Sequence, residues 1–177
     1  MEAVKFPDAA HRVVQQIIAR YPEGRQKSAL LPVLHLAQAE WGWLSPEVMD
    51  HVAGLLDIEP IEVYEVATFY TMFHLQPTGK YVLEVCRTGP CCLLGAENII
   101  EYIENKLSIR VGETSADGMF TLKTVECLAA CGYAPVLQIQ LPEEGVDSNS
   151  TYRYFENLTE EKVDEMMETL SSKPATQ

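Results

Sequence analysis

The sequence has few basic residues and no long apolar run. Lysine and arginine together number 13, against 26 aspartate and glutamate residues, which gives a formal net charge of −13 over 177 residues. A surface this negative repels nucleic acids and anionic lipids, so a polyanionic partner is not expected. No apolar stretch approaches the length of a membrane-spanning helix, and Met1–Lys5 lacks the apolar core of an export signal. We therefore expect a cytoplasmic protein that does not insert into a membrane directly.

Several functional motifs are also missing. The sequence has no C-x-x-C redox motif and no G-x-G-x-x-G dinucleotide fingerprint, so we assign no catalytic residue and no NADH or flavin ligand to this chain. All 4 histidines precede the first cysteine, Cys86, which argues against a Rieske-type centre, where histidines replace two cysteines. The 5 cysteines are odd in number and no export signal precedes them, which argues against a disulfide framework.

The cysteines that are present form two pairs. Cys86 and Cys91 have C-x4-C spacing, Cys127 and Cys131 have C-x3-C spacing, and each pair follows a β-like run. A [2Fe–2S] cluster needs four thiolates, two on each iron. A structural zinc site also takes four cysteines, but its pairs usually have C-x2-C spacing. We hypothesise that the two loops converge on one [2Fe–2S] cluster, and a zinc-stapled interaction module is the alternative from a different functional class.

The fifth cysteine, Cys92, leaves the ligand register open. With Cys86 it has C-x5-C spacing, so spacing does not separate Cys91 from Cys92. Free cysteine behaves as a small, usually buried hydrophobe, and Leu93 and Leu94 follow it. We therefore predict that Cys92 is a packing residue and that Cys91 is the ligand.

Residues 1–76 have the pattern of a small helical bundle. Apolar stripes of helical period, proline stops and Ser-Pro or Glu-Pro starts predict four helices. These are a helix that carries Val13–Ile18 and stops at Tyr21-Pro22, a second capped by Ser28 and ending near Gly42, a third from Ser45-Pro46 to about Leu56, and a fourth from Glu59-Pro60 to about Tyr70. The large aromatics of this region are expected in the core or at an interface; they are Trp41, Trp43, Phe69, Tyr70 and Phe73.

Gln76–Gly79 is a turn cluster and the predicted boundary between a helical domain, 1–76, and a second domain, 77–177. Beyond it the order β-α-β-β-β-α predicts a small sheet with helices packed against it, an α+β (α/β) fold. The predicted elements are strand 80–86, helix 94–107, strand 119–125 after the Asp117-Gly118 turn, strand 136–141, a polar loop at 142–150, strand 152–155 and a final helix capped by Thr159.

The surroundings of the cysteines suit an anionic cluster. The predicted helix 94–107 follows the first pair directly, and a helix start presents free N–H groups and partial positive charge. Backbone N–H groups of the two loops are expected to donate hydrogen bonds to sulfur; they belong to Thr88, Gly89, Ala129, Ala130 and Gly132.

Several motifs resemble one family over nearly the whole chain. They are Ala29–Leu34 with Gly42-Trp43-Leu44, Val66–Phe73, Val85–Cys91, and Glu126–Cys131 with Ala134-Pro135. Together they resemble the 24-kDa-type subunit of respiratory complex I, known in bacteria as the E-type subunit of NADH-quinone oxidoreductase. The resemblance implies a helical N-terminal bundle followed by a thioredoxin-like ferredoxin domain with one [2Fe–2S] cluster. By position its ligands are Cys86, Cys91, Cys127 and Cys131, and the family motif does not require a cysteine at position 92.

The resemblance also implies a function within an assembly. The chain would pair with a larger flavoprotein (the F-type or 51-kDa subunit) that binds NADH and FMN, and its cluster would accept single electrons from that flavin. The resemblance further implies contact with other peripheral-arm subunits and attachment to the inner face of the cell membrane through the complex. The enzymatic activity, NADH:quinone oxidoreduction, belongs to the assembly. The equivalent subunit of an NAD-linked hydrogenase or formate dehydrogenase is the alternative within the same class.

Overall fold

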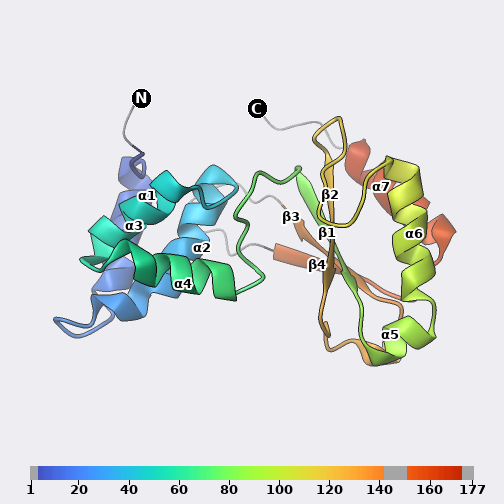
Figure 1. Ribbon diagram of the computed structural model, residues 1–177, viewed down its shortest axis with the longest axis horizontal. Coiled ribbons are helices and arrows are strands. Elements are labelled where there is room, and N and C mark those ends of the chain that lie inside the picture. The colour runs from blue at the N-terminus through green and yellow to red at the C-terminus, as the bar shows by residue number, and fades with distance from the viewer. Residues whose placement is uncertain (1–3, 142–150, 173–177) are drawn as a thin grey trace. The chain divides into compact units, whose positions relative to one another are not determined.

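The computed structural model describes residues 4–141 and 151–172. These residues form two compact units, with the division between Pro77 and Thr78 (Figure 1). The loop predicted at 142–150 lies outside the described residues. No helix in the described part of the chain is long and apolar enough to cross a membrane.

The first unit is helical, as the sequence predicts. Its elements within residues 4–77 are α1 (Asp8–Ile18), the 3-10 helix η1 (Gln26–Ala29), α2 (Leu30–Trp41), α3 (Pro46–Leu56) and α4 (Pro60–Phe69). Ser45 caps α3 by accepting a hydrogen bond from the Val48 N–H at 3.3 Å, and Pro46 occupies the first helical position. The predicted cap at Ser28 is wrong, because this residue lies inside η1 and α2 begins two residues later.

The core of the first unit comes from the apolar stripes of its helices. The fully buried side chains include Val14, Leu34, Val52, Leu56 and Val63, which come from all four of these helices. Of the predicted core or interface aromatics, Phe73 is buried, whereas Phe69 and Tyr70 at the end of α4 are exposed.

The second unit is built on a mixed sheet. Within the described residues its strands are β1 (Tyr81–Cys86), β2 (Phe120–Val125), β3 (Leu137–Leu141) and β4 (Thr151–Phe155), in the spatial order β2-β1-β3-β4. The pair β1·β2 is parallel, with Cys86 opposite Val125. The pairs β1·β3 and β3·β4 are antiparallel. Because parallel strands end at the same edge of a sheet, the chain leaves β1 and β2 at neighbouring points.

Two long helices, α6 (Ala96–Leu107) and α7 (Glu160–Ser171), lie on one side of this sheet (Figure 1). Their apolar sides and the inward side chains of the strands share one buried cluster, which includes Leu83, Val85, Ile103, Ile139 and Met167. This arrangement and the helical first unit confirm the predicted α+β class.

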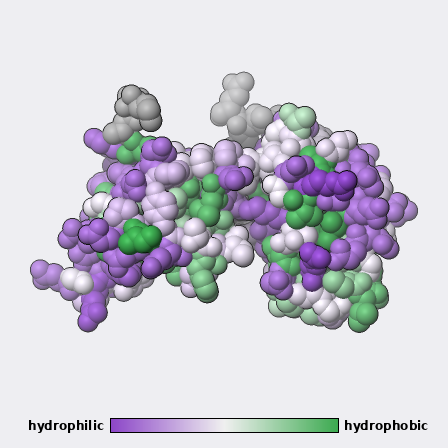
Figure 2. Space-filling view, viewed as in Figure 1, coloured by the Kyte–Doolittle hydropathy of each residue, from purple (hydrophilic) through white to green (hydrophobic). Residues whose placement is uncertain are grey.

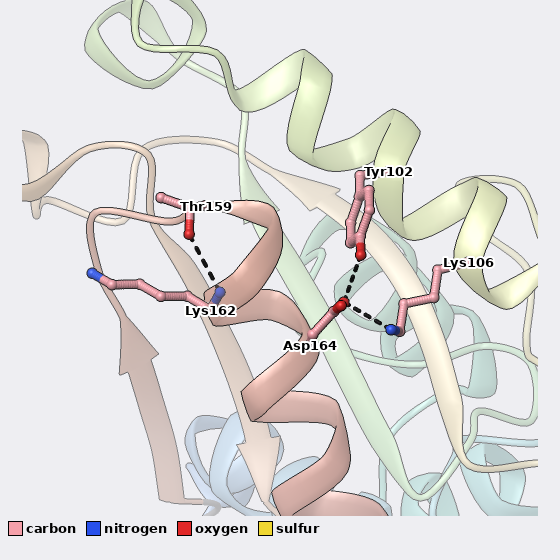
Figure 3. Close-up of polar contacts among 5 residues, drawn as sticks. All are labelled: Tyr102, Lys106, Thr159, Lys162 and Asp164. Atoms are coloured by element: carbon pink, nitrogen blue, oxygen red, sulfur yellow. Dashed lines mark hydrogen bonds and ion pairs between the residues drawn. The ribbon is translucent and has the colours of Figure 1, made fainter.

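Polar contacts hold α6 against α7 (Figure 3). The Tyr102 hydroxyl and the Lys106 ammonium both donate to Asp164 Oδ1, at 2.6 and 2.7 Å. These bonds, first that of Lys106 and then that of Tyr102, hold the pKa of Asp164 below its ordinary value. Thr159 caps α7, as predicted, by accepting from the Lys162 N–H at 3.3 Å.

Candidate metal centre

The candidate centre lies where the chain leaves the two parallel strands. Cys86 is the last residue of β1, and the loop that carries Cys127 and Cys131 begins directly after Val125, the last residue of β2. The Arg87 N–H donates to the Val125 carbonyl at 2.9 Å, which ties the beginnings of the two loops together. The β1·β2 register therefore sets the two cysteine loops side by side.

The first pair, Cys86 and Cys91, is buried, with exposed fractions of 2% and 1%. Cys91 lies in α5 (Gly89–Leu93), a five-residue helix between β1 and α6. Both thiols pack in a small apolar cluster with Ala96, Ala134 and Val136. The Cys86 N–H also donates to the Val136 carbonyl at 3.0 Å. Apolar packing and the hydrogen bond to Val136 thus hold the first loop in place without a bound metal.

The second pair, Cys127 and Cys131, is exposed, with the two Sγ atoms 3.6 Å apart. Cys131 begins a 3-10 turn, Cys131–Tyr133. Ala129, between the two cysteines, has a left-handed backbone (φ 58°), and its N–H donates to Cys127 Sγ at 3.3 Å. The Ala129 N–H is one of the loop donors to sulfur that the sequence predicts.

The four thiols influence one another across the two loops. Burial and a hydrogen bond to Cys86 raise the pKa of Cys91 to about 11, and the charge of Cys131 adds to the shift. A hydrogen bond with Cys127 is the main cause that raises the pKa of Cys131, and Cys86 contributes from the first loop. Since the charged forms repel one another, four thiolates at this site need a cationic centre to balance them.

Local donors favour one thiolate in each loop. The N–H of Ala129 is the largest cause that lowers the pKa of Cys127. Burial of Cys86 opposes its ionisation, but hydrogen bonds with the Thr88 hydroxyl, the N–H groups of Leu128 and Thr88 and the Cys91 thiol together lower the pKa of Cys86. The sequence predicts N–H donors at Thr88 and Ala129. It does not predict the N–H donors at Leu128, which acts on Cys86, and at Val136, which acts on Cys91, because they depend on how the loops fold back.

The donor set fits a two-iron cluster. The four thiols come as two pairs, one from each loop, and a [2Fe–2S] cluster takes two thiolates on each of its irons. Among the described residues, no group of three or more His, Cys, Asp and Glu side chains is already placed to hold a metal ion. Thiolate sulfur is also the ligand type that iron–sulfur clusters require.

Cys92 does not pack in the core, so that prediction is wrong. Cys92 is exposed, as are Leu93 and Leu94, at 87% and 60% for the two leucines. A step of one residue turns a helical side chain by about 100°, and with Cys91 turned inward the next positions of α5 face outward. The prediction that a long helix starts directly after the first pair is also wrong. Helix α6 begins at Ala96, after the left-handed Gly95.

Comparison with known proteins gives a consistent answer. The family model for thioredoxin-like [2Fe-2S] ferredoxins matches residues 14–171. The chain is 44% identical over 157 residues to the E-type subunit of NADH-quinone oxidoreductase from Rickettsia prowazekii (strain Madrid E), covering 88% of this chain and 82% of the relative. It is 43% identical over 156 residues to the second such E-type subunit from Rhizobium meliloti (strain 1021), covering 88% and 85%.

Solved structures show the same fold. The H2-reduced NAD+-reducing [NiFe]-hydrogenase matches 82% of this chain with a TM-score of 0.67 at 19% identity, and the match spans 22% of that chain. The air-oxidised form matches 81% of this chain with a TM-score of 0.66. The resemblance found in the sequence motifs is therefore confirmed, and the chain belongs to the thioredoxin-like [2Fe-2S] ferredoxin family.

Proposed function

We propose that this chain is the electron-transfer subunit of an NADH-quinone oxidoreductase and that Cys86, Cys91, Cys127 and Cys131 hold its one [2Fe–2S] cluster. The observation that supports the ligand set most strongly is the parallel pairing of β1 with β2, which starts both cysteine loops at one edge of the sheet. The names of the 42–44% identical relatives support the parent complex.

The residues around the sulfurs have separate tasks in this function. When bound, a [2Fe–2S] cluster accepts and returns one electron at a time. The four thiolates bind the irons, and the Ala129 N–H donates to Cys127 Sγ. The side chains of Ala134 and Val136 keep water from the first pair. Fixed donors and apolar walls tune how readily a cluster is reduced.

The electron donor in this proposal is the FMN of a partner flavoprotein that oxidises NADH. The names of the relatives include NADH, but this chain lacks a G-x-G-x-x-G fingerprint. We therefore place the NADH site on the partner. With this partner and other peripheral-arm subunits, the chain would lie in the arm attached to the inner face of the membrane.

An exposed apolar surface beside the centre supports docking of such a partner. Figure 2 shows apolar surface at the lower end of the second unit, where α5 lies. Its residues are Cys92, Leu93 and Leu94, and the residue that precedes Cys92 on α5 is Cys91. Exposed apolar patches mark protein–protein contacts, and the rate of electron transfer falls steeply with distance. A surface next to a ligand sulfur is therefore where a donor would dock.

A binding experiment tests the partner. We expect the double variant Leu93→Ser, Leu94→Ser to bind the flavoprotein of the same complex with an affinity at least tenfold lower and to co-elute with it less. Its iron content should stay at the wild-type level. Val111→Ser is the matched control, because Val111 is 41% exposed but follows the far end of α6. Unchanged binding of the double variant would exclude α5 as the docking surface.

A second measurement tests the cofactor. Anaerobically purified protein should be brown and should bleach on addition of dithionite. A colourless protein with one zinc per chain would instead support the zinc-stapled module, because zinc has no redox chemistry.

The equivalent subunit of an NAD-linked hydrogenase or formate dehydrogenase is the second candidate. The fold match to the NAD+-reducing [NiFe]-hydrogenase is compatible with it, although the 44% identity to a component of NADH-quinone oxidoreductase favours the quinone-linked complex. The neighbouring genes distinguish the two functions. A hydrogenase or formate dehydrogenase gene in the same operon would favour the alternative.

A further inference from the structure

The Thr88 side chain lies against Cys86 instead of capping the helix that it precedes. Thr88 directly precedes α5 with an extended backbone (φ −125°, ψ 166°), where a threonine normally accepts a hydrogen bond from the first turn of the helix. Ser45 and Thr159 make that bond at α3 and α7. Among the described residues, the Thr88 hydroxyl makes no such cap. Its Oγ1 instead lies 3.4 Å from Cys86 Sγ.

The direction of this bond follows from the state of the sulfur. A hydroxyl has a single proton to donate, and a thiolate bound to iron has none. With Cys86 as a ligand, the Thr88 hydroxyl is therefore the donor and Cys86 Sγ is the acceptor.

We propose that Thr88 is a positioning residue whose hydroxyl donates to Cys86 Sγ and thereby raises the reduction potential of the cluster. The inference rests on the proposed function, because it requires Cys86 to be a ligand. Reduction adds one electron to the centre and increases the negative charge on its sulfurs. No bond breaks, and the proton stays on Thr88 Oγ1. A donor aimed at sulfur stabilises the more negative form more strongly, which favours reduction.

Three variants of the full-length chain separate the hydroxyl from the shape of the side chain. Thr88→Val keeps the branched shape and removes the donor, Thr88→Ala removes both, and Thr88→Ser keeps the donor. Thr169→Val is the matched control, because that hydroxyl donates to the Glu165 carbonyl of its own helix, α7. The measurement is the midpoint potential of the cluster, from a redox titration followed by electron paramagnetic resonance, with iron and sulfide counted in each variant.

We expect Thr88→Val and Thr88→Ala to lower the equilibrium constant for one-electron reduction at least threefold, a shift of about −28 mV at 59 mV per tenfold change. Thr88→Ser and Thr169→Val should stay within about a third of that shift. If one hydroxyl-free variant does not assemble a cluster, the other decides.

Two results would overturn the proposal. One is a wild-type potential in a hydroxyl-free variant with a full complement of iron. The other is an equal shift in Thr88→Ser and Thr88→Val, which would make packing the cause. Wild-type protein without acid-labile sulfide is a different failure, because it removes the proposed function before any variant is titrated.

Discussion

The two cysteine loops follow parallel neighbouring strands but are built differently. In the first loop Cys86 and Cys91 are buried against Ala96 and Val136, and a short helix holds Cys91. In the second loop both cysteines are exposed, and the left-handed residue Ala129 shapes the turn between them.

This difference assigns different tasks to the two loops. The first is fixed by burial of apolar surface, which needs no metal. In the second, Leu128 and Ala130 pack partly buried against the apolar cluster of the first loop, but both cysteines are exposed, so bonds to iron would add more to its order. The iron of the second pair would also lie nearer to the surface. We therefore expect the buried pair to control assembly of the cluster and the exposed pair to control access to it.

The largest effect should come from removal of a ligand in the buried pair. Cys91→Ser should reduce bound iron to less than a tenth, since a buried serine hydroxyl is a poor replacement for a thiolate. Cys92→Ser, one residue further along α5, is the control and should retain normal iron, because Cys92 faces outward. Iron and sulfide analysis of both proteins is the measurement. If Cys92→Ser loses the cluster and Cys91→Ser keeps it, the ligand register is wrong.

Alkylation of metal-free protein should distinguish the pairs directly. The thiolate is the species that reacts, so burial and a pKa of about 11 should make Cys91 at least tenfold slower than Cys127 near pH 8. The rate at Cys91 should keep rising until the pH approaches 11. The rate at Cys127 should level off at a lower pH, because its pKa is lowered, chiefly by the Ala129 N–H.

Mass spectrometry with a pulse of iodoacetamide measures each site. Exposed Cys92 serves as the internal control for reagent access. Equal rates at Cys91 and Cys127 would show that the first loop opens when metal is absent, and the contrast between the loops would then fail.

A smaller effect is expected from the backbone of the second loop. A left-handed residue with a side chain costs about 1 kcal/mol relative to glycine, so Ala129→Gly should leave the free energy of unfolding equal or up to about 1 kcal/mol higher. Ala129→Val should lower it. In the first loop Gly89 has no positive φ, and an added Cβ meets no atom of the described chain within 4 Å. Gly89→Ala should therefore not lower the free energy of unfolding of the metal-free chain, measured in urea. A loss for Ala129→Gly would contradict this explanation.

The smallest effect should come from Asp164→Asn, which weakens the contact of α6 with α7 and touches neither loop. The variant should have a slightly lower melting temperature and an unchanged cluster. The Lys106 and Tyr102 bonds depress the pKa of Asp164 below 3.8. Its contribution is therefore present above that value and is lost as the pH falls through the folded pKa. The difference between wild type and variant should shrink in acid, and a difference that grows there would contradict the assignment.

Much of this molecule follows from local sequence patterns. Ser45-Pro46 and Thr159 mark helix starts correctly, because capping is a short-range interaction. The cysteine spacings and their neighbouring motifs identified the family. The patterns failed where the outcome depends on side-chain direction within a short helix. Cys92, which two leucines follow, looks like a core residue, but α5 turns it outward because Cys91 faces the cluster of buried side chains.

The long-range features could not be read from the pattern. Nothing local indicates that β1 and β2 are parallel neighbours, and this pairing is what sets the loops side by side. Nor does a threonine before a proline-containing helix show that its hydroxyl will lie near Cys86 Sγ instead of capping the helix.

Electron paramagnetic resonance of the dithionite-reduced, anaerobically purified protein, with iron and acid-labile sulfide counted in the same sample, tests the central claim most directly. The convergence of the two loops on one cluster predicts two irons and two sulfides per chain and the signal of one reduced [2Fe–2S] centre. A protein with no labile sulfide and no such signal, or with one zinc in place of iron, would contradict it.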